Sequence, residues 1–177
     1  KPALDELGLD ATGLKEDGQG LAVDEFMRTT NPRIFAIGDV TGGALYSHKA
    51  AAMGIRAAEN ALGQPKPLDT TTLLRGLNTS PEAAAIGLTE AQANKAGYEV
   101  VMANIPYGTN AMAMIRLATG GAIKVVAEAK YGKVLGVHIV GPGATEMIGE
   151  AALALEMEAT LDELAQGFRY HPSFGES

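Results

Sequence analysis

A short proline-rich segment near the middle of this chain limits what the whole chain can fold into. Gln64-Pro65-Lys66-Pro67 places two prolines two residues apart, which stiffens the backbone and prevents a helix or strand from running through it. The pattern before this segment contains loops and one helix, whereas the pattern after it is rich in strands. We therefore predict a domain boundary here, with one unit at residues 1–66 and a second at residues 67–177.

The first unit is expected to contain one short apolar strand and one helix. We predict the strand at residues 34–37, ending at Gly38-Asp39, and the helix at about 47–62, after a glycine-rich turn. Ser47 is expected to cap the start of this helix and Gly63 its end. Apolar residues recur along the helix at steps of three or four: Ala50, Met53, Ala57 and Ala61.

The second unit is expected to be an α+β domain in which helices cover one face of an antiparallel sheet. Helices are predicted at 89–96, where Thr89, Glu90 and Gln92 form a suitable start, and at about 145–158. Five segments have β character: 83–88, 98–105, 111–117, 122–129 and 134–140.

The charge of the chain works against nucleic acid as a partner. Lys and Arg total 14 against 21 Asp and Glu, giving a net charge of −7, and no basic run appears. No apolar stretch approaches the roughly 20 residues that cross a bilayer, so we expect no membrane partner and a cytoplasmic location. Because the chain has no cysteine, it contains no disulfide, thiolate metal site or cysteine nucleophile of its own, and we expect no metal.

The first candidate site lies where the predicted strand 34–37 ends. The Asp39 carboxylate, beside glycines that let a ligand approach the backbone, suits a ribose or another polyhydroxyl group. The first turn of the next helix, near Ser47, would stabilise an anion such as a reduced flavin ring, with His48 and Lys49 as further donors. Taken alone, a Gly-Asp pair more often caps its own loop, and the neighbouring helix is what favours a ligand site.

The second candidate site is His171-Pro172-Ser173-Phe174-Gly175-Glu176 near the end of the chain. Histidine exchanges protons near neutral pH, and a carboxylate five residues later can fold back across a proline turn to orient it. Such a pair could move a proton to and from a thiol. The alternative is a surface histidine beside a turn, because a His and a Glu five residues apart often occur by chance.

A third segment, Gly141-Pro142-Gly143, imitates a dinucleotide-binding loop between a strand and a helix. Glu146 occupies the position of the last glycine of the dinucleotide-binding pattern G-x-G-x-x-G, and its charge would repel a pyrophosphate. Pro142 also removes a backbone donor. We therefore interpret this segment as a tight turn with Thr145 as the helix cap. His138, inside the preceding strand, is expected to be a structural residue.

In order and spacing, these motifs resemble the C-terminal part of the pyridine nucleotide-disulfide oxidoreductases, a family of flavoproteins, and most closely the dihydrolipoamide dehydrogenases. The chain begins Lys1-Pro2 and stops one residue after Glu176, so we expect it to be part of a longer polypeptide. The resemblance covers nearly the whole chain. The matching segments are Val23-Asp24, 28–40, Ser47-His48-Lys49-Ala50, Ser80-Pro81-Glu82, 86–90, 135–143, His171-Pro172-Ser173 and Glu176.

The resemblance implies a fold and a set of roles. It implies a dimerisation domain preceded by the C-terminal segment of the FAD- and NAD-binding region. Asp39 would bind the ribityl chain of FAD. His171, joined to Pro172 by a cis peptide bond, would be the catalytic acid/base oriented by Glu176 in the active site of the other subunit. The residues whose backbone would lie against the flavin ring are Leu45, Tyr46, Ser47 and His48.

The resemblance also implies an activity for the complete protein. It would oxidise a dithiol and pass the electrons through a redox disulfide and FAD to NAD, as a homodimer, with the lipoyl domains of a 2-oxo acid dehydrogenase complex as possible partners. The cysteine pair and the G-x-G-x-x-G loop that this requires are absent here, so we expect this chain alone to be inactive and to bind FAD weakly or not at all.

Two departures from the family pattern leave the exact substrate open. Ser173 stands where threonine is more usual, and Arg169 stands where the lipoamide enzymes often have another histidine. A glutathione reductase-like enzyme and a mercuric reductase-like enzyme are alternatives, although the latter relies on C-terminal cysteines. A non-catalytic dimerisation module is the alternative from another class, and the paired His and Glu argue against it.

Overall fold

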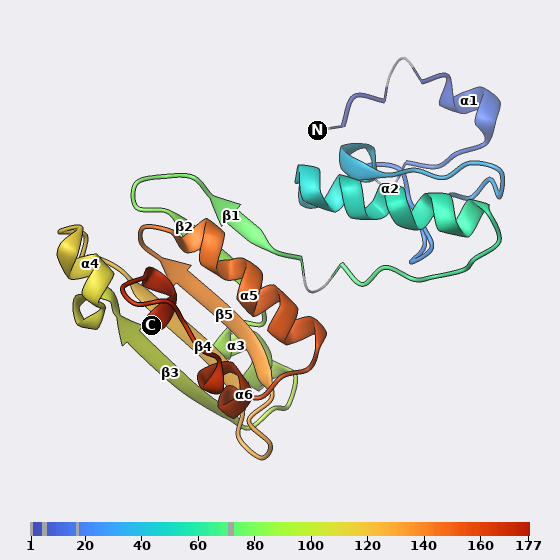
Figure 1. The fold of residues 1–177 in the computed structure, drawn as a ribbon. Coiled ribbons are helices and arrows are strands. Elements are labelled where there is room, and N and C mark those ends of the chain that lie inside the picture. The colour runs from blue at the N-terminus through green and yellow to red at the C-terminus, as the bar shows by residue number, and fades with distance from the viewer. Residues whose placement is uncertain (1, 5–6, 17, 71–72) are drawn as a thin grey trace. The chain divides into compact units, whose positions relative to one another are not determined.

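The computed structural model describes residues 2–4, 7–16, 18–70 and 73–177, which form two compact units, Lys1–Thr70 and Thr71–Ser177 (Figure 1). The first unit includes Leu68, because the Leu68 N–H donates to the Glu25 carbonyl at 2.9 Å and the Leu68 side chain packs near Met27 and Met53. The boundary between the compact units therefore lies, along the sequence, a few residues after the Pro65–Pro67 segment. The assignment of residues 1–66 and 67–177 as domains stays a prediction.

The first unit is built around one long helix. It contains α1 (Leu9–Thr12), the 3-10 helix η1 (Gly38–Thr41) and α2 (Ser47–Ala61), and α2 matches the predicted helix closely. Gly63 has a φ of 79° just beyond α2, as expected for a helix-ending glycine. Two small apolar clusters lie in this unit: one around Leu4, Leu21 and Ala36, the other around Met27, Met53 and Ala57.

Two expectations for the first unit are wrong. Residues 34–37 do not form a strand, because the neighbouring described chain offers only an isolated bridge between Arg28 and Phe35. Ser47 does not cap α2. The helix already begins at Ser47, and the N-cap residue is Tyr46, whose side chain makes no capping hydrogen bond.

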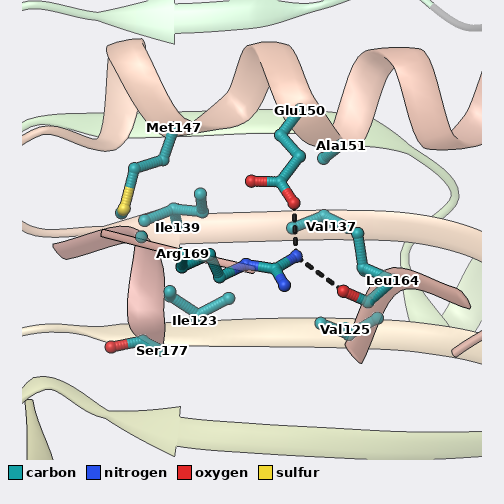
Figure 2. Close-up of a pocket in the computed structure, with 11 residues that line it drawn as sticks. Ile123, Val125, Val137, Ile139, Met147, Glu150, Ala151, Leu164, Arg169 and Ser177 are labelled. Carbon is teal, nitrogen blue, oxygen red and sulfur yellow. Dashed lines mark hydrogen bonds and ion pairs between the residues drawn. The ribbon is translucent and has the colours of Figure 1, made fainter. Parts of the chain in front are cut away.

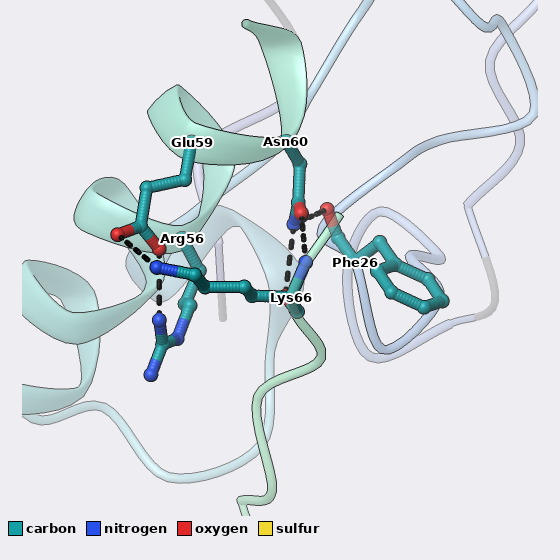
Figure 3. A network of polar contacts seen from close by, with 5 residues as sticks. All are labelled: Phe26, Arg56, Glu59, Asn60 and Lys66. Carbon is teal, nitrogen blue, oxygen red and sulfur yellow. Dashed lines mark hydrogen bonds and ion pairs between the residues drawn. The ribbon is translucent and has the colours of Figure 1, made fainter. Parts of the chain in front are cut away.

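The end of α2 is bonded to the proline-rich segment (Figure 3). The buried Asn60 side chain donates to the carbonyls of Phe26 at 2.9 Å and Lys66 at 3.2 Å, and accepts the Lys66 N–H at 2.6 Å. Hydrogen bonds from Arg56 and then Lys66 to the Glu59 carboxylate lower the pKa of Glu59. These contacts hold the segment after α2 in place as far as Lys66.

The second unit contains an antiparallel sheet, as predicted. Residues 73–177 form five strands in the order β1-β2-β5-β4-β3, each antiparallel to its neighbours. The α5 helix (Ala144–Glu156) crosses this sheet, with α6 (Leu161–Gln166) and the C-terminal segment on the same side (Figure 1). The strands are β1 (Arg75–Leu77), β2 (Ala83–Gly87), β3 (Val100–Pro106), β4 (Ala122–Glu128) and β5 (Val134–Val140).

Helices pack on both faces of the sheet and not on one face as predicted. On β4, Val125 belongs to the main cluster with Ile148 of α5, whereas its neighbour Val126 packs with Ala93 of α3 (Glu90–Lys95). Successive side chains of a strand point to opposite faces, so α3 and α5 lie on opposite sides. The fold class, an antiparallel sheet with helices, is unaffected by this correction.

The segment predicted as a strand at 111–117 is a helix. It forms α4 (Ala111–Ile115), which follows the 3-10 turn η2 (Tyr107–Thr109). Alanine and methionine are good helix formers, and the Asn110 side chain caps the helix by accepting the Ala113 N–H at 3.0 Å. The local helix signals therefore outweigh the apolar pattern of Ile115 and Leu117.

Helix capping explains the remaining boundaries. The predicted start at Thr89 is confirmed, because Thr89 and Gln92 form a reciprocal capping box on α3. Thr145 does not cap α5, which begins after Gly143. Three short elements were not predicted: α1, which has four residues, β1, which has three, and α6. Thr160 and Glu163 form the capping-box pattern that could have revealed α6.

Candidate functional site

The histidine and glutamate at the end of the chain are in direct contact. His171 Nδ1 lies 2.7 Å from Glu176 Oε1, and Glu176 Oε2 accepts the Ser173 N–H at 2.9 Å. The 3-10 turn η3 (Phe174–Glu176) brings the carboxylate back toward the ring, and the His171-Pro172 bond is cis, as expected. The His171 side chain is 70% exposed, so the pair lies at the surface of this unit.

This contact decides which ring nitrogen of His171 can act as a base. Hydrogen bonds from the Ser173 N–H and then from His171 lower the pKa of Glu176, so the carboxylate is ionised at neutral pH and can only accept. The proton of the neutral ring therefore lies on Nδ1, and the lone pair lies on Nε2. Within the described residues Nε2 makes no hydrogen bond, so it is available to an incoming group.

Replacing Glu176 with Gln should remove a pH-dependent part of the stability. Because the pKa of Glu176 is lowered from 4.5 in the folded state, the carboxylate stabilises the fold above that value, and this contribution is lost as the pH falls through the lowered pKa. Urea-unfolding midpoints of the unmodified chain and the Glu176→Gln variant should differ most near neutral pH and converge on acidification. A difference that stays constant with pH would contradict this.

An aromatic pair supports the segment that carries the dyad. The rings of Tyr107 and Phe174 stack with centroids 5.6 Å apart, and the Tyr107 hydroxyl donates to the Pro142 carbonyl at 3.1 Å. Tyr107 is fully buried, and burial, with a contribution from the charge of Glu82, raises its pKa to about 12. A side chain at Gly141 would lie only 2.6 Å from the Tyr107 ring, so only glycine at this position lets the turn pack against the ring.

The turn at Gly141–Gly143 is not a phosphate-binding loop. The Glu82 carboxylate accepts the Thr145 hydroxyl at 2.9 Å and the Thr145 N–H at 3.2 Å at the start of α5. The Thr145 hydroxyl, the Thr145 N–H and the Gly143 N–H lower the pKa of Glu82. A carboxylate of the chain itself thus occupies the helix end that a pyrophosphate would need, which confirms the interpretation as a turn. His138 is structural as expected, with Nε2 3.1 Å from the Leu88 carbonyl.

A small apolar cavity of about 70 Å³ lies between the sheet and α5 (Figure 2). Arg169 lies across it, forming an ion pair with Glu150 and donating to the Leu164 carbonyl at 2.6 Å. Arg169 therefore attaches the chain just before His171 to α5 and α6. The lining residues are Ile123, Val125, Val137, Ile139, Met147, Glu150, Ala151, Leu164, Arg169, Gly175 and Ser177.

The residues predicted to contact a flavin all lie in the first unit, in η1, in the loop after it and in the first turn of α2. Asp39 is exposed in η1, and its carboxylate makes no hydrogen bond within the described residues. Gly38 is buried with a φ of 71°, and a side chain there would lie 3.0 Å from Ala50 Cβ, so η1 packs closely on α2.

The first turn of α2 presents exposed polar groups beside this loop. Leu45, Ser47 and His48 are exposed, and the rings of Tyr46 and His48 stack with centroids 5.1 Å apart. No side chain caps the helix, so its positive end can face a ligand. A free carboxylate next to an uncapped helix start fits a polyhydroxyl chain joined to a ring that becomes anionic.

Lys49, the other expected donor at this helix start, folds back onto the chain's own backbone. It is buried, 9% exposed, and its ammonium donates to the Gly42 carbonyl at 2.8 Å. Lys49 therefore joins α2 to the glycine turn after Asp39. Sequence carries no signal for this contact, because it depends on the direction in which a flexible side chain folds back.

Comparison with known proteins gives the class to which this fold and these sites belong. The model of the pyridine nucleotide-disulphide oxidoreductase dimerisation domain matches residues 75–177, and the model of the pyridine nucleotide-disulphide oxidoreductases matches residues 2–64. The chain therefore belongs to the pyridine nucleotide-disulphide oxidoreductase family. This confirms both the resemblance and the expected antiparallel dimerisation fold.

Within this family, the similar curated proteins are dihydrolipoyl dehydrogenases, which are oxidoreductases. The chain is 38% identical over 177 residues to dihydrolipoyl dehydrogenase of Geobacillus stearothermophilus, with 99% of the chain and 38% of the relative covered. The chain is 41% identical over 177 residues to the dihydrolipoyl dehydrogenase of Thermus scotoductus, again with 99% of the chain and 38% of the relative covered. The chain thus spans about 38% of the length of the curated relatives it matches. The family depends on FAD and NAD.

Solved structures agree with the fold. LpdA from Mycobacterium tuberculosis matches with a TM-score of 0.92 and 32% identity over 98% of this chain and 38% of LpdA. The flavoprotein disulfide reductase RclA from Escherichia coli matches with a TM-score of 0.89 at 23% identity over 99% of this chain and 41% of RclA, which shows the fold alone.

In the part of the chain that the structure describes, no helix is long and apolar enough to cross a membrane. The same residues contain no group of three or more His, Cys, Asp or Glu side chains arranged to hold a metal ion.

Proposed function

We propose that this chain is the dimerisation and flavin-contacting part of a dihydrolipoyl dehydrogenase-like enzyme that oxidises a dithiol and passes the electrons through a disulfide and FAD to NAD. The observation that carries the proposal is the 2.7 Å contact between His171 Nδ1 and Glu176 Oε1, which leaves Nε2 as an exposed base. The names of the similar curated proteins support the dithiol as substrate. The proposal includes the cytoplasmic location expected from the sequence.

His171 has one chemical task in this proposal. Its Nε2 accepts the proton from one thiol of the dithiol substrate, and the thiolate so formed attacks a disulfide sulfur. A sulfur–sulfur bond forms to the substrate, the disulfide bond breaks, and the other sulfur leaves as a thiolate. Glu176 stabilises the imidazolium that results from the proton transfer. The disulfide belongs to another part of the protein, because this chain has no cysteine.

We assign the FAD contacts to the loop and helix start of the first unit. The free Asp39 carboxylate would accept hydrogen bonds from the ribityl hydroxyls, and the segment from Leu45 to His48 would lie against the ring. When bound, FAD supplies a two-electron acceptor for the dithiol. The chain itself contributes the acceptor oxygens, the uncapped helix end and the close packing at Gly38.

Dimerisation belongs to the same proposal. The second unit matches a dimerisation domain, so the enzyme would be a homodimer in which the His171–Glu176 pair of one subunit serves the flavin of the other. The lipoyl domains of a 2-oxo acid dehydrogenase complex would then deliver the dithiol. This chain alone is expected to have no oxidoreductase turnover, because it lacks the cysteine pair.

Replacing Asp39 with Ala in the full-length protein that carries this chain tests the proposed cofactor and activity together. Losing one charge-assisted hydrogen-bond acceptor, at about 1.5–3 kcal/mol, should raise the Kd for FAD by about tenfold or more. Dihydrolipoamide oxidation with NAD⁺ should fall in step with FAD content and recover when FAD is added.

The matched control is Asp10→Ala, which removes another exposed carboxylate of the same unit. Asp10→Ala should leave FAD content and activity unchanged. An unmodified full-length protein that holds FAD but does not oxidise dihydrolipoamide would overturn the proposed substrate. Equal FAD affinity in the Asp39→Ala variant and the unmodified protein would overturn the cofactor contact.

A further inference from the structure

Asn110 joins the start of α4 to the C-terminal end of the chain. Its side chain is buried, 5% exposed, and its Oδ1 accepts the Ala113 N–H at 3.0 Å. Its Nδ2 donates to the Ser173 carbonyl at 2.9 Å, to the Phe174 carbonyl at 3.3 Å and to Ser177 Oγ at 2.9 Å. One amide thus contacts two parts of the chain more than 60 residues apart.

The surroundings of Asn110 require an amide. A helix cap needs only an acceptor oxygen, which serine, threonine or aspartate would supply equally well. The two carbonyls of the C-terminal segment need a donor, which those residues cannot provide in the same place. Exchanging the amide oxygen and nitrogen would turn the NH₂ group toward the Ala113 N–H, so the orientation is also determined by its neighbours. The donor half of the side chain therefore serves the C-terminal segment and not the helix.

The backbone that Asn110 holds is the backbone that orients the dyad. The carbonyl of Ser173 accepts from Asn110, while the N–H of the same residue donates to the Glu176 carboxylate at 2.9 Å. That carboxylate contacts His171. A continuous set of hydrogen bonds thus runs from the buried amide to the exposed imidazole, through the turn between His171 and Glu176.

The apolar contact beside Asn110 cannot replace these hydrogen bonds. The stacked rings of Tyr107 and Phe174 hold the Phe174 side chain, but a ring contact fixes neither the direction of the Ser173 peptide nor that of the Glu176 carboxylate. Hydrogen bonds to two successive carbonyls fix the direction of the peptide units. Asn110 and the aromatic pair therefore make different contributions to the same turn.

We propose that Asn110 is a positioning residue for the His171–Glu176 pair: its buried amide holds the Ser173–Phe174 backbone so that the Ser173 N–H keeps the carboxylate against Nδ1 of the imidazole. The consequence for catalysis rests on the proposed function, whereas the effect on the geometry of the turn does not. Asn110 is buried, and it acts on the pair through the C-terminal segment.

Asn110→Ser and Asn110→Asp test this proposal. Both keep a capping oxygen for α4, and both remove the amide donors, the first without adding a charge. By NMR on this chain, exchange of the Ser173 amide proton should speed up by about tenfold or more, because its bond to Glu176 loosens. The nitrogen shifts of the His171 ring should also lose their preference for the Nδ1–H tautomer. In the full-length enzyme kcat/KM for dihydrolipoamide should fall about 10- to 100-fold, since small displacements of an acid/base group cost that much.

Asn60→Ser is the matched control. Asn60 is also buried, donates to two carbonyls and accepts one N–H, but it lies in the first unit at the end of α2. Its replacement should lower the melting temperature and leave the Ser173 and His171 signals and kcat/KM unchanged. The proposal is overturned if Asn110→Ser leaves the two NMR signals as they are in the unmodified chain. If those signals move but the unmodified enzyme does not oxidise dihydrolipoamide, the positioning role stands and the proposed function fails.

Discussion

Replacing His171 with Gln in the full-length protein that carries this chain should lower kcat/KM for dihydrolipoamide by about 10²- to 10⁴-fold, the usual contribution of one acid/base group. Glutamine keeps a polar side chain of similar length but has no nitrogen that takes up a proton. The Nε2 base is lost, whereas the fold is retained, because the His171 side chain is 70% exposed and its one side-chain hydrogen bond within the described residues is with Glu176. Steady-state rates with dihydrolipoamide and NAD⁺ measure this effect.

The control for this variant is His138→Gln. His138 lies inside β5 and contacts the Leu88 carbonyl, which the glutamine amide can also reach as a donor. This variant should keep nearly all of the activity. Equal activity of the His171→Gln variant and the unmodified enzyme would show that the exposed imidazole has no part in the reaction.

Replacing Gly136 with Ala should unfold the second unit or destabilise it by about 3–5 kcal/mol, the range of the most damaging single substitutions. A methyl group on Gly136 would lie 2.1 Å from the Leu88 carbonyl oxygen and 2.8 Å from the Leu88 nitrogen, and backbone atoms in a sheet cannot give way cheaply. Leu88 would have to move, breaking its bond to the Leu135 carbonyl at 2.8 Å and its contact with His138. Urea unfolding followed by circular dichroism measures the loss.

Gly149→Ala is the opposite case in the same unit. Gly149 lies in the exposed part of α5, and an added methyl group meets nothing within 4 Å. The change should stabilise the unit by about 0.5–1 kcal/mol, because alanine loses less backbone entropy in a helix. If both substitutions have the same effect, close approach of the backbone at Gly136 does not determine the stability of this sheet.

The parts of the fold with strong local patterns could be predicted from the sequence. The strand at 134–140 was predicted with the boundaries of β5, and the helices near 47–62 and 145–158 agree with α2 and α5 within two residues. These segments combine an apolar pattern with glycines that end them. Their local preference and their place in the core point to the same structure.

Elements that depend on distant partners could not be predicted in this way. Residues 34–37 have the apolar character of a strand, but a strand forms only where another strand pairs with it, and here Arg28 offers one bridge. Residues 111–117 are the reverse case: the segment is apolar enough for a strand, but the capping side chain of Asn110 and the helix-forming alanines favour a helix.

The candidate site shows the same division. The spacing of His171 and Glu176 was enough to predict that they could meet, because a turn of five residues allows it. The support for that turn comes from Asn110 and Tyr107, which lie more than 60 residues earlier and carry no local signal of this role. Long-range contacts of this kind become visible only once the chain is folded.

The central claim is that His171 takes the proton of a dithiol and has no other part in electron transfer. Measuring the two half-reactions separately tests this claim most directly. Rapid mixing without oxygen measures the rate at which dihydrolipoamide reduces the flavin of the full-length enzyme, and separately the rate at which NADH reduces it. The His171→Gln variant should be slower by about 100-fold or more with dihydrolipoamide and within about twofold of the unmodified enzyme with NADH. Equal slowing of both half-reactions, or of neither, would contradict the account.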